Sequence, residues 1–121
     1  MSMFNIYITI TIGVLLCFYF SSRSSDIRKL VRQSARWSTA AKQDESPMIA
    51  VLHANYGAGY LWALKDIATP VEISMAAGIN IAKFEKEIIH VQDEATKSMI
   101  RACPSFGPDP TYLTSIGGEG M

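Results

Sequence analysis

No charged side chain precedes Arg23 in this sequence. A cleaved signal peptide usually begins with basic residues and has small residues before its cleavage site, and residues 1–5 contain no base. A bacterial lipoprotein signal needs a small residue just before its cysteine, whereas Leu16 occupies that place before Cys17. These absences predict that the N-terminal segment is retained in the working protein.

Cysteine and histidine are scarce, with two of each. Cys17 lies within an apolar run and Cys103 lies far beyond it, so we expect no disulfide within the chain, which fits a reducing compartment. His90, Asp93 and Glu94 share a helical face, but this set is more typical of a solvated polar face than of a metal site. The glycines form neither a GxGxxG motif nor a P-loop. The sequence therefore predicts no catalytic residue, no metal, no cofactor and no small-molecule substrate, and we expect a protein that is not an enzyme.

Residues 3–20 form an uncharged run rich in Ile, Leu, Phe and Tyr. A helix of this length is roughly 27 Å long, close to the ~30 Å hydrocarbon core of a bilayer. Alternating isoleucines at its start would suit a β-strand, but Gly13 and the apolar residues after it fit a helix better. We therefore predict one transmembrane helix, with Tyr7 and Tyr19 near the two interfaces. The side chains expected to face lipid are Phe4, Ile6, Tyr7, Ile8, Ile10, Ile12, Val14, Leu15, Leu16, Phe18, Tyr19 and Phe20.

A basic block follows the apolar run, and from Asp44 onward ten acids stand against five bases. Basic residues beside a membrane span stay on the cytosolic side. The sequence thus predicts an N-terminus outside the membrane or in the lumen and a C-terminal part on the cytosolic side. Anionic lipid headgroups would attract the same block. The expected headgroup contacts are Arg23, Arg28, Lys29, Arg32 and Arg36.

Residues 24–41 carry a narrow stripe of apolar and small side chains at helical spacing. Two interpretations of this segment remain open. It is either a solvated helix continuous with the membrane anchor, or a helix that lies on the membrane surface with its arginines among the phosphates. The stripe consists of Ile27, Leu30, Val31, Ser34, Ser38 and Ala41.

After a polar break, residues 48–64 are apolar nearly all round, interrupted by His53 and Asn55. A helix without a polar face must be buried. A domain of this size has too few other elements to wrap it, so we expect neighbouring subunits to cover part of it. A second membrane span is the alternative, although the run is short and has His53 in its middle. Small residues that permit close approach and aromatic residues of large area define the expected helix–helix interface. Its members are Ala50, Ala54, Gly57, Ala58, Tyr60 and Trp62.

Capping signals divide the rest of the chain. Asp44 or Ser46 is expected to cap the helix that starts at Pro47, and Thr69 opens a capping box with Pro70 at the first helical position. Gly78 should end that short helix and Asn80 should begin the next one, over residues 81–103. This last helix has an apolar stripe at helical spacing and stops before Pro104. The stripe is Ile81, Phe84, Ile88, Val91 and Ala95.

These segments predict an all-α protein with one membrane helix and one small helical domain. The expected parts are an anchor (1–22), a basic juxtamembrane helix and linker (23–45), a helical domain (46–103) and an extended tail rich in Pro and Gly (104–121). The short helix, turn and longer helix after Thr69 also have the outline of a helix-turn-helix. However, residues 71–103 contain four bases and five acids, which does not suit phosphate attraction, so we expect no nucleic acid partner.

One resemblance adds to this interpretation. The stretch Arg36-Trp37-Ser38-Thr39-Ala40-Ala41-Lys42-Gln43-Asp44, followed by His53-Ala54-Asn55-Tyr56-Gly57-Ala58-Gly59-Tyr60-Leu61-Trp62-Ala63-Leu64, resembles small membrane-anchored, minor capsid-associated virion proteins of large icosahedral double-stranded DNA viruses. The order of membrane span, basic region and small helical domain is similar too. The resemblance covers about the middle half of the chain and implies a virion component tied to the inner membrane beneath the capsid. It implies no activity and no cofactor.

The function expected from the sequence is therefore structural. The protein would be anchored in a lipid bilayer and pack against other subunits of a larger assembly, as a viral minor capsid protein that links the inner membrane to the capsid shell. Two alternatives remain: an accessory subunit of a cellular membrane complex, and a membrane-tethered nucleic-acid binder. The acidic bias after Asp44 argues against the second alternative.

Overall fold

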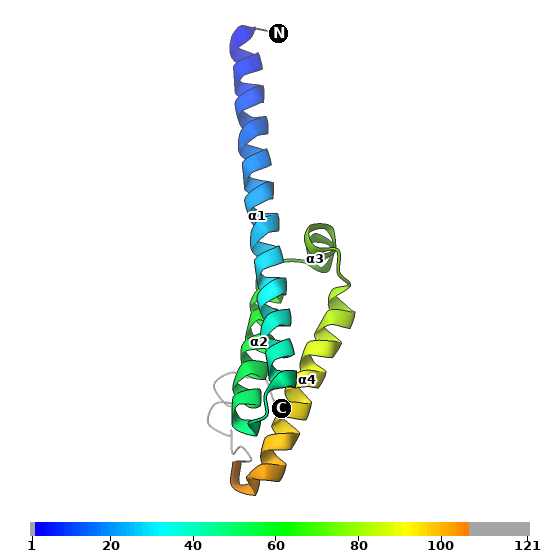
Figure 1. Cartoon of the computed structure of the whole chain (residues 1–121). Helices are drawn as coiled ribbons and strands as arrows, with labels where there is room; N and C mark the ends of the chain where they lie inside the picture. Colours follow the sequence, from blue (N-terminus) through cyan, green and yellow to red (C-terminus); the bar gives the residue numbers. More distant parts are fainter. Residues whose placement is uncertain (1, 107–121) are drawn as a thin grey trace, which may run out of the picture.

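The computed structural model describes residues 2–106, which form four α-helices and one short 3-10 helix without any strand. The elements are α1 (Met3–Gln43), α2 (Pro47–Ile67), α3 (Pro70–Ala77), α4 (Ile81–Ala102) and η1 (Pro104–Phe106). The all-α prediction is confirmed for this part of the chain. The second half of α1 forms a bundle with α2 and α4, and the first half of α1 extends beyond that bundle (Figure 1).

Capping residues set the helix boundaries where the sequence predicts them. Thr69 and Glu72 make a reciprocal capping box, with both hydrogen bonds 3.2 Å long. Gly78 ends α3 in the left-handed conformation at φ 68°, which a glycine adopts at little cost. The Asn80 side chain caps α4 by accepting a hydrogen bond from the Lys83 amide. Ser46 is the N-cap of α2 by position, with Pro47 at its start.

Helix α1 runs without a break through the apolar and the basic segments. Of the two interpretations of residues 24–41, the structure has the helix that continues the apolar segment. At the other end of the chain, the expected extended tail begins with the single 3-10 turn η1. The remaining tail, residues 107–121, lies outside the described residues.

Three small apolar clusters hold the bundle together, and α1 and α4 both pack mainly on α2. The predicted stripe on α1 faces this core, since Ile27, Ser34, Ser38 and Ala41 are buried. The predicted stripe on α4 also faces inward. The buried members of the clusters are Ile27, Leu64, Ala68 and Ile73; Ala41, Ala50, Ala54 and Ala95; and Ala58, Leu61 and Ile88.

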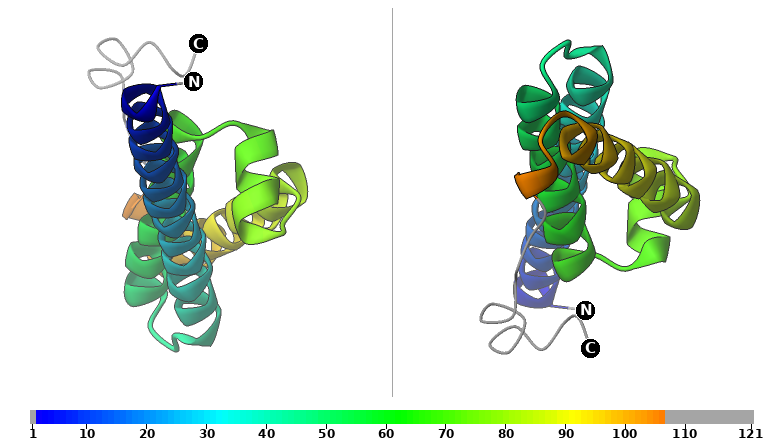
Figure 2. Two further views of the ribbon diagram at one scale, coloured as in Figure 1. Left: turned by 90° about the horizontal axis from the view of Figure 1, so that it is seen from above. Right: turned by 90° about the horizontal axis from the view of Figure 1, so that it is seen from below.

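Helix α3 stands to one side of the bundle, at the level where α1 leaves it, and lies across the direction of α1 (Figures 1 and 2). Helix α4 then runs from the end of α3 back toward the far end of the bundle. Only one side of α3 contributes to the core, through Ile73, which packs with Ile27 and Leu64.

Candidate functional site

No side chain in residues 3–20 of α1 is buried against another helix within residues 2–106. Every large apolar side chain in residues 3–20 keeps between 38% and 72% of its surface exposed, and these include all the side chains expected to face lipid. Its most apolar stretch has a mean hydropathy of 1.9 and no buried residue. Within the described part of the chain, α1 is the one helix long and apolar enough to cross a membrane.

The two threonine hydroxyls inside the apolar half of α1 are satisfied locally. The Thr9 hydroxyl donates to the Asn5 carbonyl at 2.9 Å, and the Thr11 hydroxyl donates to the Tyr7 carbonyl at 2.8 Å. Such return bonds to the preceding turn remove the cost of placing a hydroxyl in hydrocarbon. The two threonines are therefore compatible with a lipid environment.

The basic residues of α1 lie at increasing distances from the end of the apolar run. At 1.5 Å per residue, Arg23 is ~4.5 Å beyond Phe20 along the axis, whereas Arg32 and Arg36 are ~18 Å and ~24 Å beyond it. The polar headgroup layer is only about 5–8 Å thick on each side of the hydrocarbon core. For a helix that runs along the bilayer normal, only Arg23 has its backbone within this layer, whereas Arg28 and Lys29 are ~12 Å and ~13.5 Å beyond Phe20 and reach it only through their long side chains. Arg32 and Arg36 are exposed further along the bundle, and the Arg36 guanidinium lies 5.5 Å from the centre of the Trp37 ring.

Arg23 joins α1 to the segment that carries α3. Its Nε donates to the Glu72 carboxylate, and its Nη2 donates to the Ile67 carbonyl. The hydrogen bond from Arg23 is the main reason that the pKa of Glu72 falls to about 2, and the same bond raises the pKa of Arg23. Arg28 adds a weaker contact of 3.5 Å to the Ala76 carbonyl. Arg23 is therefore engaged within the protein, which the sequence pattern did not reveal.

The small residues of α2 make its closest contact with α1. Ala50, Ala54 and Ala58 are buried, and Gly57 lies against α1 so closely that a Cβ there would be 3.1 Å from the Ser34 carbonyl oxygen. Tyr60 and Trp62 were expected in the same interface, but they remain 37% and 48% exposed. Within residues 2–106, these two side chains are therefore only partly covered.

An apolar stripe on α2 faces outward along the whole helix. Its members keep between 37% and 46% of their surface exposed and recur at intervals of three to seven residues. The stripe consists of Ile49, Leu52, Tyr56, Tyr60 and Ile67. The sequence predicted that the bundle could not wrap α2 completely, and within residues 2–106 this surface is indeed left uncovered.

An aromatic cluster joins the far end of α1 to α2. The Trp37 ring centre lies 5.0 Å from that of His53 and 5.3 Å from that of Tyr56. His53 Nδ1 is 2.7 Å from a carboxylate oxygen of Asp44, so this histidine has a polar partner, as expected, although it is only partly buried. Aromatic contacts of this geometry stabilise by about 0.5–1.5 kcal/mol each beyond area burial. The cluster fixes the turn between the helices.

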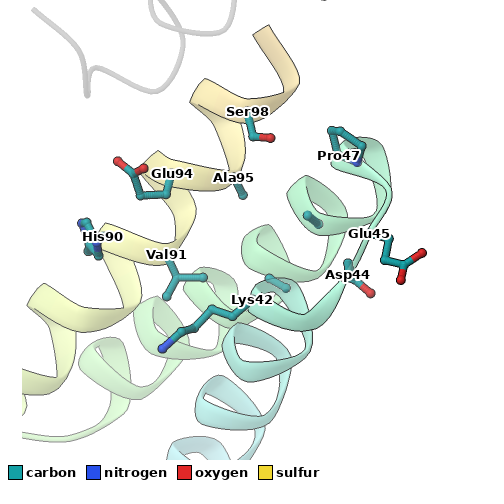
Figure 3. A pocket seen from close by; sticks show the side chains of 11 residues that line it. Lys42, Asp44, Glu45, Pro47, His90, Val91, Glu94, Ala95 and Ser98 are labelled. Carbon is teal, nitrogen blue, oxygen red and sulfur yellow. The ribbon is translucent and has the colours of Figure 1, made fainter. Parts of the chain in front are cut away.

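A groove of about 290 Å³ separates the end of α1 and the following turn from α4 (Figure 3). Its lining mixes the polar side chains of Lys42, His90 and Glu94 with the apolar Val91 and Ala95. None of the ion pairs found within residues 2–106 joins two of these lining residues.

No protein family, curated protein or solved structure matches this chain. Three features of the described residues bear on function: the exposed apolar half of α1, the Arg23–Glu72 contact beside it, and the outward stripe on α2.

Proposed function

We propose that this protein is a non-enzymatic structural subunit, anchored in a membrane by α1 and packed through its helical bundle into a larger assembly. The observation that carries this proposal is the exposure of the apolar half of α1, whose most apolar stretch has no buried residue. Fully burying one large apolar side chain contributes about 1.5–3 kcal/mol, so leaving thirteen of them in water would be very unfavourable. A bilayer would remove this surface from water without changing the fold.

The basic block supports an orientation with the N-terminus outside or in the lumen and the bundle on the cytosolic side. The resemblance to virion proteins supports a more specific role, that of a minor capsid protein linking an inner viral membrane to the capsid shell. In that arrangement, the bundle would lie between the membrane and the shell. The part of the α2 stripe from Ile49 to Tyr60 would then supply the surface that packs against neighbouring subunits.

Alkaline extraction of membranes that contain the full chain tests the anchor. The native protein is expected to stay with the lipid. A double variant with Ile12→Arg and Leu15→Arg should be released, because each charge costs about 2.5–3.5 kcal/mol at the centre of a span. A control with Glu87→Arg and Asp93→Arg adds arginines at exposed positions on α4 and should remain bound. Release of the native protein would overturn the proposal.

Fractionation of the native source tests the assembly. Recovery of the protein in purified particles, together with their shell proteins, would support the minor capsid role. Recovery only in cellular membranes would overturn that role and favour an accessory subunit of a cellular complex. A Leu52→Glu substitution on the α2 stripe should reduce incorporation in either case, while leaving membrane retention unchanged.

A further inference from the structure

The end of the bundle nearest the apolar half of α1 carries its own exposed apolar patch. Val71 and Met75 on α3 keep 67% and 83% of their surface exposed, and Ile67 at the end of α2 keeps 44%. We refer to Ile67, Val71 and Met75 as the α3 foot. Val71 and Met75 are four residues apart in one helix, so they lie on the same face. An exposed apolar patch at one end of a bundle is typical of a surface that contacts another protein or a membrane.

Contacts with α1 fix the position of the α3 foot along the axis of α1. Arg23, which binds the Glu72 side chain and the Ile67 carbonyl, follows the apolar run by only three residues, or ~4.5 Å along the axis. Ile67 also lines a groove of about 190 Å³ together with Tyr19, which belongs to the apolar run itself. A membrane that contains residues 3–20 would therefore have its headgroup layer at the depth of α3.

The exposed face of α3 is turned away from the bundle. Ile73 points into the core beside Ile27, Glu72 points toward Arg23, and Ser74 borders a groove with the start of α4. Because residues are 100° apart around a helix, Val71 and Met75 lie opposite Ile73, in the one direction that none of these contacts occupies. Helix α3 itself lies across α1, as a helix resting on a membrane surface would (Figures 1 and 2).

The charge on α3 suits the same location. Glu72 is the one charged residue within α3, and the guanidinium of Arg23 neutralises it. Docking α3 on a bilayer would consequently bring no unpaired acid of α3 itself toward anionic headgroups. Short apolar faces at this depth bind in the region between headgroups and acyl chains.

We propose that α3 is an interfacial foot, whose Val71 and Met75 insert into the surface of the bilayer that α1 spans and fix the tilt of the bundle relative to it. This inference rests on the proposed function, because it requires α1 to lie in a membrane. The occupant of the patch is lipid, and the Arg23–Glu72 contact holds the foot at the correct depth.

Depth-dependent fluorescence quenching in phospholipid vesicles tests this proposal on the full chain. The native cysteines are replaced through Cys17→Ala and Cys103→Ala, and a single new cysteine carries an environment-sensitive fluorophore. Met75→Cys probes the foot. Met48→Cys is the matched control, since Met48 is also exposed, at 63%, but lies at the opposite end of the bundle. Ile12→Cys reports on the anchor.

Lipids with a nitroxide near the headgroup are expected to quench the label at position 75 several-fold more than the label at position 48. A nitroxide deep in the acyl chain should quench the label at position 12. If position 12 is quenched while position 75 behaves like position 48, the interfacial role of the α3 foot is contradicted and the membrane anchor is supported. If position 12 is not quenched, the anchor and the foot are both overturned. Adding Arg23→Gln should reduce the quenching at position 75 without changing that at position 12.

Discussion

The Ser34 hydroxyl donates a buried hydrogen bond of 2.7 Å to the carbonyl of Gly57, 23 residues later in the chain. This bond crosses from α1 to α2 at the point of their closest approach. A Cβ on Gly57 would lie 2.2 Å from the Ser38 hydroxyl oxygen and 3.1 Å from two backbone atoms of α1. The contact between the two helices therefore depends on a position without a side chain and on small residues opposite it.

Gly57→Ala is expected to destabilise the bundle by about 1–3 kcal/mol, because the added methyl group overlaps the Ser38 hydroxyl oxygen and lies tight against two backbone atoms of α1. Gly59→Ala is the matched control in the same helix, where a Cβ would meet nothing within 4 Å. That control should be neutral or stabilise by up to about 1 kcal/mol through helix propensity. Thermal unfolding followed by circular dichroism in detergent measures both. Equal melting temperatures for the two variants would contradict this account of the contact.

The two buried serines of α1 should respond differently to alanine. Ser34→Ala removes a buried hydrogen bond and is expected to cost about 0.5–1.5 kcal/mol. The Ser38 hydroxyl is buried and has no hydrogen-bond partner among residues 2–106, so Ser38→Ala relieves an unsatisfied polar group and should be neutral or stabilising. The same unfolding measurement compares them. A larger loss for Ser38→Ala than for Ser34→Ala would mean that Ser38 has a partner.

Local signals in the sequence predicted the helix boundaries well. The capping box at Thr69, the left-handed Gly78 and the Asn80 cap depend on residues close together in the chain, so their patterns can be recognised directly. The buried stripes of α1 and α4 followed from helical periodicity for the same reason. Periodicity identifies which face of a helix is apolar, and the structure places those faces in the core.

Partners from distant segments could not be predicted in this way. The small residues of α2 indicated a close helix contact, but nothing in their spacing identified Ser34 and Ser38 as the side chains opposite them. In the sequence, Arg23 is one member of a basic block. Its partner Glu72 lies 49 residues later in the chain, and only the fold brings the two together. The α3 foot could not be predicted from the sequence. Val71 and Met75 lie in a short helix that is apolar nearly all round, so periodicity does not distinguish its core residues from its surface residues.

The contact between Arg23 and Glu72 should depend on acidity. The pKa of Glu72 is lowered from 4.5 to about 2 in the folded protein, chiefly by the hydrogen bond from Arg23. A lowered folded-state pKa means that the pair stabilises the fold fully above pH 4.5 and loses its effect as the pH falls toward 2. Because both groups are about one-third exposed, solvent screening keeps the effect modest.

Glu72→Gln should therefore lower the melting temperature near neutral pH, and the difference from the native protein should shrink below pH 4.5. Arg23→Gln is expected to behave in the same way, and the double variant should be little worse than either single change. Added salt should reduce all three effects. A difference that stays constant down to pH 2 would show that the carboxylate is not the group responsible.

The orientation of α1 can be measured with glycosylation acceptors. An acceptor attached to the N-terminus is expected to be glycosylated in microsomes, whereas one attached to the C-terminus should not be, because Arg23, Arg28 and Lys29 hold their end of the span on the cytosolic side. Replacing these three bases with glutamine should weaken the preference. Glycosylation of the C-terminal acceptor alone would reverse the orientation proposed for the protein.

Ala58 offers a test of the bundle as an assembly module. It is 2% exposed and packs with Leu61 of its own helix and Ile88 of α4. Ala58→Leu should therefore overpack this cluster, at a cost of about 1–3 kcal/mol, while leaving the apolar half of α1 untouched. Ala82→Leu makes the same change at an exposed position on α4 and should be nearly neutral. We expect the Ala58 variant to stay in the membrane but to incorporate less efficiently into the parent assembly than the Ala82 variant. Equal incorporation would mean that the packing of α2 on α4 does not matter for assembly. The bundle would then only shield the end of the membrane-spanning half of α1.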